Sequence, residues 1–179
     1  MEGTKLRVLI PAEQIDKRIK ELGAQITADY PGDAPLYLIG ILKGAVMFHA
    51  DLARVIDRQV RIDFIGISSY GKGKTSSGQV KLTKDLDVSV EGADVLLVED
   101  IIDTGVTLNY LLGVFQPRKP RSIRIAAFLD KPHRRMRPVT PTYVGFTIPD
   151  EFVVGYGLDF AEDYRQLRDV CVLVNGPES

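Results

Sequence analysis

The segment Asp94-Val95-Leu96-Leu97-Val98-Glu99-Asp100-Ile101-Ile102-Asp103-Thr104-Gly105-Val106-Thr107-Leu108 joins an apolar run to a polar turn and a second apolar pattern. Residues 94–98 predict a buried strand. A helix should follow and end before Pro117, with apolar positions at helical spacing: Leu108, Leu111, Leu112 and Phe115. A buried strand that leads directly into a helix is typical of α/β proteins, which bind ligands at the carboxyl ends of parallel strands.

Patterns upstream predict a helix, a strand, a helix and a strand. The first helix begins near Pro11, ends at a loop over 30–35, and carries apolar residues at near-helical spacing: Ile15, Ile19, Leu22 and Ile26. Residues 36–42 are apolar on both faces, which is typical of a central strand. A helix around 48–56 and a strand over 60–68 then predict a right-handed parallel crossover. In that last strand we expect burial of Ile62, Phe64 and Ile67.

Three further strands are predicted downstream, over 122–129, 143–148 and 170–174. No repeat, low-complexity tract or linker divides the chain. We therefore expect one α/β domain over residues 1–179, with a mainly parallel central sheet flanked by helices. Residues from about 68 to 87 are too polar and Gly-rich for a core, and we interpret them as a flexible lid loop rather than an inert insert.

Composition limits the classes of function. The 179 residues are 45% hydrophobic, which suits a full-sized core without a metal or disulfide. With 23 basic and 24 acidic residues the net charge is −1, so the global field typical of nucleic-acid-binding proteins is missing. No apolar run approaches the ~20 residues of a membrane span. A single cysteine, Cys171, lies in an apolar run and should be an inert buried residue, which favours a cytoplasmic protein.

The turn between strand and helix carries the chemistry. Gly105 allows close approach of a ligand, Thr104 and Thr107 offer hydroxyls, and the first helical amides are free donors, which together indicate a monophosphate cradle. Three carboxylates beside it, on Glu99, Asp100 and Asp103, would repel a bare anion but suit sugar hydroxyls and magnesium. The alternative is a simple helix cap, with Asp103 or Thr104 as the N-cap residue.

The whole string resembles the phosphoribosyl-pyrophosphate-binding motif of type I phosphoribosyltransferases. That motif has four apolar residues, two acids, two apolar residues and Asp-Thr-Gly-x-Thr, and residues 95–107 fit it without a gap. Neither G-x-G-x-x-G after a strand nor G-x-x-x-x-G-K-[ST] occurs, which weakens competing nucleotide-binding folds. Other segments, in order, resemble hypoxanthine-guanine phosphoribosyltransferases, and the likeness spans about residues 10–174: Leu42-Lys43-Gly44, Ser69-Tyr70-Gly71, Lys131 and Phe152 to Asp159.

The resemblance implies the type I fold, with a small hood from about residue 146 to 179 that includes the N-terminal segment. It implies a purine salvage glycosyltransferase that moves the 5-phosphoribosyl group from phosphoribosyl pyrophosphate to hypoxanthine or guanine, giving IMP or GMP and pyrophosphate. Magnesium (Mg2+) is the implied cofactor. The implied partners are these small molecules, with no nucleic acid and no membrane, and a homodimer or homotetramer is usual in the family.

Residue roles follow from the same resemblance. Lys43 and Gly44 would hold pyrophosphate beside a cis Leu42–Lys43 peptide, and Ser69 and Tyr70 would close over the reacting centre. Glu99 and Asp100 would engage ribose hydroxyls and magnesium. The 5-phosphate and base would be met by Asp103, Thr104, Gly105, Val106 and Thr107, with Asp103 as the general base. The remaining roles are the 6-oxo contact for Lys131, ring stacking for Phe152, backbone groups for Val153, magnesium for Asp159 and pyrophosphate for Arg165.

Simpler interpretations stay open for several of these residues. Phe152 and Val153 suit a plain core, while Lys43, Asp159 and Arg165 suit solvated charges. We interpret neither His49 nor His133 as a ligand. A non-enzymatic alternative is an RNA-binding regulator, since pyrimidine-operon regulators share the fold, but the near-neutral charge speaks against it. A preference for xanthine or adenine is the alternative among enzymes.

Overall fold

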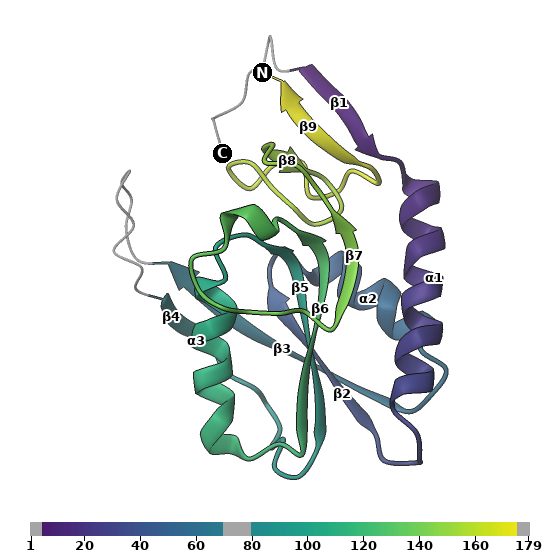
Figure 1. Cartoon of the computed structure of the whole chain (residues 1–179), viewed down its shortest axis with the longest axis vertical. Helices are drawn as coiled ribbons and strands as arrows, with labels where there is room; N and C mark the ends of the chain where they lie inside the picture. Colours follow the sequence, from purple (N-terminus) through teal and green to yellow (C-terminus); the bar gives the residue numbers. More distant parts are fainter. Residues whose placement is uncertain (1–4, 70–79, 175–179) are drawn as a thin grey trace.

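Two β-sheets organise the molecule (Figure 1). The computed structural model describes residues 5–69 and 80–174. The larger sheet has six strands in the order β4-β3-β2-β5-β6-β7, and the smaller has three in the order β1-β9-β8. None of the helices in these two ranges has the length and apolar character needed to span a membrane.

The larger sheet is parallel except at one edge. The pairs β2–β3, β2–β5, β5–β6 and β6–β7 are parallel, and only β4 runs antiparallel, against β3. The carboxyl ends of the central strands therefore meet at one edge of the sheet. The strand bounds are β2 Leu36–Leu42, β3 Val60–Ser69, β4 Val80–Lys84, β5 Asp94–Ile102, β6 Ser122–Asp130 and β7 Tyr143–Thr147.

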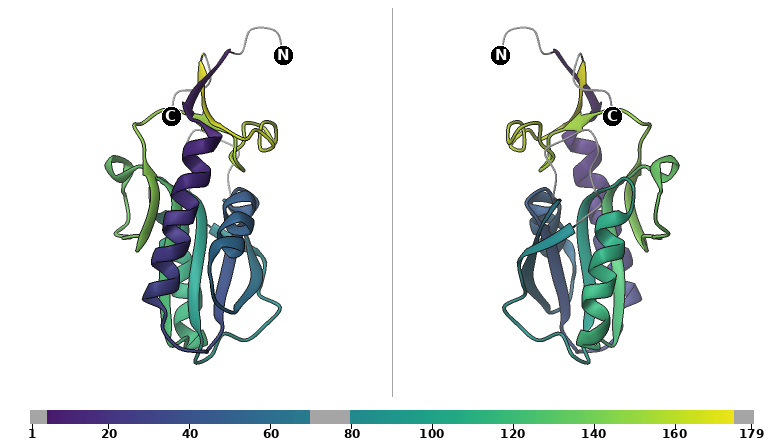
Figure 2. Two further views of the ribbon diagram at one scale, coloured as in Figure 1. Left: turned by 90° about the vertical axis from the view of Figure 1, so that its right-hand side faces the viewer. Right: turned by 90° about the vertical axis from the view of Figure 1, so that its left-hand side faces the viewer.

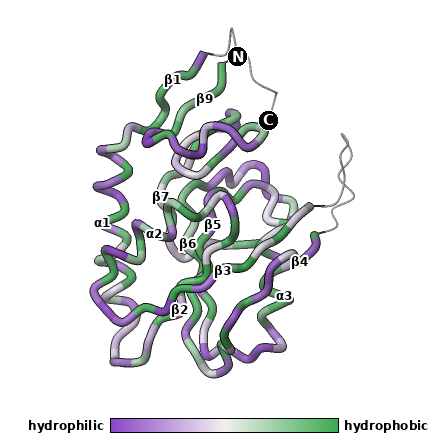
Figure 3. The backbone as a smooth tube through the Cα atoms, turned by 180° about the vertical axis from the view of Figure 1, so that it is seen from behind, coloured by the Kyte–Doolittle hydropathy of each residue, from purple (hydrophilic) through white to green (hydrophobic). Residues whose placement is uncertain are grey.

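Helices cover both faces of this sheet. On one face α1 (Ala12–Asp29) and α2 (Val46–Val55) share a core with residues of β2, β5 and β6, and on the other α3 (Val106–Phe115) packs against the alternate residues of the same strands. Figure 2 shows α1 and α3 from the two opposite sides of the molecule. The hydrophobic residues gather along the central strands, as Figure 3 shows, because each strand is buried on both faces.

The smaller sheet pairs the beginning and the end of the described chain. Antiparallel β9 (Val170–Val174) lies between β1 (Lys5–Ile10) and β8 (Val153–Val154). This is the region where the sequence places the hood. Its core includes Cys171, which is 5% exposed, as expected of an inert buried thiol. A side-chain contact links it to α1, because Asp169 Oδ1 accepts the backbone N–H of Ala12 at 2.7 Å.

Most predicted elements are confirmed, and two expectations need correction. Ile62 is 54% exposed rather than buried, since α2 packs over β2 and β5 and leaves the outer β3 partly uncovered. Asp63 and Ile65 are buried instead, while Phe64 and Ile67, which were also expected to be buried, are only partly so. The expected loop over 68–87 includes the end of β3 and the strand β4, whose Val-Lys-Leu-Thr-Lys alternation was overlooked. The remainder of the expected lid loop, residues 70–79, lies outside the described residues.

Candidate active site

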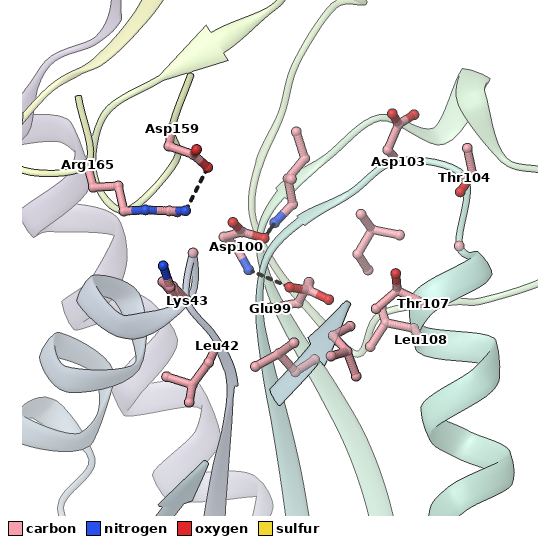
Figure 4. Close-up of a pocket in the computed structure, with 16 residues that line it drawn as sticks. Leu42, Lys43, Glu99, Asp100, Asp103, Thr104, Thr107, Leu108, Asp159 and Arg165 are labelled. Atoms are coloured by element: carbon pink, nitrogen blue, oxygen red, sulfur yellow. Dashed lines mark hydrogen bonds and ion pairs between the residues drawn. The ribbon is translucent and has the colours of Figure 1, made fainter. Parts of the chain in front are cut away.

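A cleft of about 290 Å³ opens at the carboxyl edge of the larger sheet (Figure 4). Its walls come from the end of β2, the end of β5, the turn into α3 and the loop that precedes β9. Residues that are more than 100 positions apart in sequence thus meet here. The sequence-predicted site residues that line it are Lys43, Gly44, Glu99, Asp100, Asp103, Thr104, Gly105, Thr107, Asp159 and Arg165.

The turn at Thr104 and Gly105 shapes one end of the cleft. Gly105 has a left-handed φ of 79°, and a Cβ there would lie 2.7 Å from the carbonyl oxygen of Arg137, so only glycine fits without strain. Helix α3 begins at Val106 with Gly105 as its N-cap and no side-chain cap. The simple-cap alternative, with Asp103 or Thr104 as N-cap, is therefore wrong. Thr104 Oγ1 nevertheless accepts the N–H of Val106 at 3.4 Å, so it is the next amides of α3, at Thr107 and Leu108, that remain available to an anion.

Two carboxylates lie at the floor of the cleft. Glu99 is 6% exposed, and burial, followed by the charge of Asp100, raises the pKa of its carboxyl well above the ordinary value. Burial also raises the pKa of Asp100. Gly44 faces this pair so closely that a Cβ on it would lie 1.6 Å from Asp100 Oδ2. The close approach explains why glycine follows Lys43.

The basic groups of the cleft are paired with acids. Lys43, after a cis Leu42–Lys43 peptide, lies 2.7 Å from Glu162 Oε2. Arg165 lies 2.9 Å from Asp159 Oδ1, 3.3 Å from Glu162 Oε1, and donates to the carbonyl oxygen of Gly157 at 2.7 Å. Lys43 is 66% exposed at its side chain and Arg165 is 21% exposed. Sequence reasoning missed Glu162, since one of its two partners, Lys43, is distant in the chain.

A second cavity, of about 430 Å³, adjoins the cleft and shares Asp100, Ile101, Asp103 and Asp159 with it. Its other lining residues are Lys131, Phe152, Val153 and Leu158. Lys131 follows β6 and is 6% exposed, and its ammonium donates to the carbonyl oxygen of Glu151 at 2.8 Å. Phe152 meets the ring of Phe160 edge-on, with centroids 5.7 Å apart.

Asp103 lies at the boundary between the two cavities. Its Oδ1 accepts a hydrogen bond from Nε of Arg134 at 3.0 Å, and its side chain is 41% exposed. The sequence-derived site did not include Arg134, although the basic run from Lys131 to Arg135 could have indicated it. Of the remaining predicted residues, Val106 begins α3, Ser69 ends β3, and Tyr70 lies outside the described residues.

The three residues expected at magnesium do not form a preformed metal cluster. Among residues 5–69 and 80–174, no group of three or more His, Cys, Asp or Glu side chains could hold a metal ion by itself. Asp159 is instead paired with Arg165, and its Oδ2 accepts the N–H of Glu162 at 2.8 Å. His49 stays apart from the cleft, since it is buried in α2 with its Nε2 3.1 Å from the carbonyl oxygen of Leu38.

The candidate site thus combines a glycine turn at a helix N-terminus with a buried lysine and an aromatic ring, at the edge of a mainly parallel sheet. The sequence matches the family profile described as the phosphoribosyl transferase domain over residues 11–161. A hypoxanthine-guanine phosphoribosyltransferase of Bacillus subtilis (strain 168) is 53% identical over 93% of this chain and 92% of its own. The chain therefore belongs to the hypoxanthine-guanine phosphoribosyltransferase family of phosphoribosyltransferases.

Solved structures agree with this assignment. The crystal structure of a hypoxanthine-guanine phosphoribosyltransferase from Bacillus anthracis, with a HEPES molecule in its active site, superimposes with a TM-score of 0.90 at 47% identity, covering 95% of this chain and 100% of that chain. The hypoxanthine phosphoribosyltransferase of Trypanosoma cruzi, in complex with the product IMP, superimposes with a TM-score of 0.89 at 44% identity, covering 98% and 97%. The type I fold expected from the sequence is confirmed.

Proposed function

We propose that this chain transfers the 5-phosphoribosyl group of phosphoribosyl pyrophosphate to hypoxanthine or guanine and releases pyrophosphate. The observation that carries the proposal is the pair of adjoining cavities, one built around a helix N-terminus and the other around a buried lysine. A relative solved with IMP and relatives named for both bases support it. The products are then IMP and GMP, and the process is purine salvage.

The first cavity suits the sugar phosphate. The amides of α3, with the hydroxyls of Thr104 and Thr107, would hold the 5-phosphate, and Gly105 lets the backbone come close. Val106 contributes its backbone whatever its side chain. Glu99 and Asp100 would accept hydrogen bonds from the ribose hydroxyls.

The buried carboxylates also fit a divalent cation. Burial raises the pKa values of Glu99 and Asp100, and the charge of Arg165, which acts on Asp100 in the opposite direction, does not offset it. Magnesium keeps several waters and substrate phosphates as ligands, so it needs one or two carboxylates rather than a protein cage. We propose that Glu99, Asp100 and Asp159 hold it directly or through water. When bound, magnesium supplies positive charge to the departing pyrophosphate.

The second cavity suits a 6-oxopurine. An ammonium group has three donors, and Lys131 uses two of them on Glu151 and Asp150, which leaves one for the 6-oxo oxygen of the base. Phe152 would stack on the ring and Val153 would offer backbone groups to its edge. Asp103, at the boundary of the cavities, would accept the proton that the purine ring loses.

The leaving group requires cations at the opposite end of the cleft. Lys43 and Arg165 would stabilise the pyrophosphate as negative charge develops on it, and the backbone at Gly44 leaves room for its oxygens. Both cations are paired with Glu162 before substrate binds. Pyrophosphate binding must therefore replace those ion pairs.

The expected partners are these small molecules, and we propose a cytoplasmic enzyme on the grounds of its single buried thiol. A homodimer or homotetramer remains a prediction.

Pyrophosphate release tests the function directly. It should be measured with hypoxanthine, guanine, xanthine, adenine and uracil, with and without magnesium. We expect release with the first two bases, little with adenine or uracil, and a requirement for magnesium. Release with none of the bases, together with retention of RNA on a filter, would instead support the regulatory alternative.

A further inference from the structure

Arg134 joins two carboxylates at the edge of the base cavity. Its Nε donates to Asp103 Oδ1 at 3.0 Å, and its NH1 group donates to Asp150 Oδ2 at 3.3 Å. The other oxygen of Asp150, Oδ1, lies 3.4 Å from the ammonium of Lys131. A continuous chain of charged contacts thus runs from Lys131 through Asp150 and Arg134 to Asp103.

The backbone around Arg134 is fastened to the phosphate-binding turn. Arg134 ends a short 3-10 helix, Pro132–Arg134, and the next residue donates from NH1 to the carbonyl oxygens of Ile102, at 3.1 Å, and Asp103, at 2.7 Å. The N–H groups of the two residues after that both reach the carbonyl oxygen of Thr104. The base of the Arg134 side chain is therefore fixed relative to the backbone of Asp103.

Stability does not account for this arrangement. The side chains of Arg134 and Asp103 are 34% and 41% exposed, and ion pairs as exposed as this one contribute only about 0–1 kcal/mol. The arrangement instead fixes orientation, because a planar guanidinium donates to two carboxylates in two fixed directions. It also occupies only Oδ1 of Asp103, and among the described residues Oδ2 accepts no hydrogen bond.

We propose that Arg134 is a positioning residue, which orients the Asp103 carboxylate for proton acceptance and couples it through Asp150 to the base-binding Lys131. The inference rests on the proposed function, in which Asp103 accepts the purine proton. A base that binds Lys131 therefore contacts one end of the chain of charged contacts whose other end orients the Asp103 carboxylate. A point charge at position 134 would not replace it, because an ammonium does not reach both carboxylates in the same way.

The test is a set of kinetic comparisons on the full chain. Arg134→Gln, Asp150→Asn and the double variant form a cycle, and Arg134→Lys keeps the charge without the fork. Arg118→Gln is the matched control, because Arg118 also ends a 3-10 helix and pairs with an exposed aspartate, Asp85, at 2.6 Å. Turnover, the KM for each substrate and the melting temperature should be measured for all five variants and the native enzyme.

We expect Arg134→Gln to lower kcat roughly 10–100-fold, as misorientation of a reacting group does, with a KM for phosphoribosyl pyrophosphate within about two-fold of native. Asp150→Asn should lower kcat in the same way, and the double variant should be little worse than Arg134→Gln, because the two side chains act as one unit. Arg134→Lys should recover little, and Arg118→Gln should match the native enzyme.

Three results would overturn the inference while the native enzyme is active. They are an Arg134→Gln variant that behaves like Arg118→Gln, effects of Arg134→Gln and Asp150→Asn that multiply in the double variant, and full recovery by Arg134→Lys. A native enzyme that transfers phosphoribose to no base would instead overturn the proposed function, and the inference with it.

Discussion

Asp103 has one oxygen engaged by Arg134 and lies where the two cavities meet, so its own substitution addresses the proton transfer. We predict that Asp103→Asn retains the fold and binds phosphoribosyl pyrophosphate but loses ~10²–10⁴-fold in turnover, because an amide does not accept the purine proton. Single-turnover rates and equilibrium binding separate the two effects. Unchanged turnover would remove Asp103 from this role.

Lys131 should decide which purines react. Its ammonium only donates hydrogen bonds, so it suits the 6-oxo group and meets the 6-amino group of adenine donor against donor. Such a mismatch rejects a substrate by up to ~10⁴–10⁵-fold in kcat/KM. We predict good activity with hypoxanthine and guanine, poor activity with adenine, and a much smaller ratio in Lys131→Met. A ratio that Lys131→Met left unchanged would contradict this account of the base cavity.

The buried charge of Glu99 should lower the free energy of unfolding at neutral pH. Burial raises the pKa of its carboxyl, so the folded chain binds this proton more tightly than the unfolded chain does. Stability is therefore lost as pH rises from the ordinary pKa of 4.5 to the raised pKa, by about 1.4 kcal/mol for each pH unit between the two values. We predict that Glu99→Gln raises the melting temperature at pH 7.5 without ligand and converges with native near pH 4.5.

Melting curves across that pH range, in a chelator, make the measurement. Glu91→Gln is the control, because Glu91 is an exposed glutamate outside both cavities. A Glu99→Gln difference that did not change with pH would mean that burial of its charge is not the cause.

Candidate residues that lie within one contiguous motif could be predicted from the sequence. Residues whose role depends on a contact between two separate segments could not. The turn from Glu99 to Thr107 is local, so a single string indicated a cradle. Arg134 and Asp150 contact each other from different segments, and Glu162 contacts the distant Lys43 as well as the nearby Arg165; no spacing in the sequence brings Glu162 next to Lys43. Their positions follow from the packing of the two sheets.

At the scale of elements, α1 depends on a cap that its own sequence does not provide. Its N-cap residue is Pro11, without a side-chain hydrogen bond, and Asp169 supplies the acceptor for the N–H of Ala12 at 2.7 Å. The cap also ties α1 to the smaller sheet, since Asp169 immediately precedes β9.

We predict that Asp169→Ala lowers the free energy of unfolding by about 0.5–2 kcal/mol, the usual cost of losing an N-terminal cap. Chemical denaturation should be compared with Asp163→Ala, which removes an exposed carboxylate from the same loop and should change little. Equal effects of the two substitutions would show that charge in the loop, rather than the cap, is responsible.

Strands that are apolar on both faces were the most predictable elements. The predicted bounds of β2, 36–42, agree with the structure, because a run that is apolar on both faces fits only a central strand covered on both sides. The outer strands were harder: β8 has two residues, β4 was taken as loop, and the buried face of β3 was reversed at Ile62. Which face of β3, the strand next to the edge, is covered depends on how far a helix reaches, and that is not local information.

At the scale of the whole molecule, the larger and the smaller sheet each contribute residues to the site. The larger sheet presents the turn before α3, Lys43 and Lys131 at its carboxyl edge. The segments around the smaller sheet bring Phe152, Val153, Asp159 and Arg165 over it. Each cavity is lined from both parts. The site is therefore complete only when the smaller sheet is seated, which the cap at Asp169 helps to secure.

The ion pair between Lys43 and Glu162 spans these two parts. In the proposed function, where Lys43 binds the departing pyrophosphate, Glu162 therefore competes with that product for Lys43. The Lys43 ammonium holds the pKa of Glu162 below its ordinary value, as expected of a carboxylate paired with a cation. We predict that Glu162→Gln binds pyrophosphate several-fold more tightly, as expected when a charged competitor is removed, and that stopped-flow traces show slower escape after the chemical step. Asp163→Asn should leave both quantities unchanged, and an unaltered inhibition constant in Glu162→Gln would refute the idea. On this account Glu162 speeds turnover by accelerating the release of pyrophosphate, and it lowers the affinity for phosphoribosyl pyrophosphate.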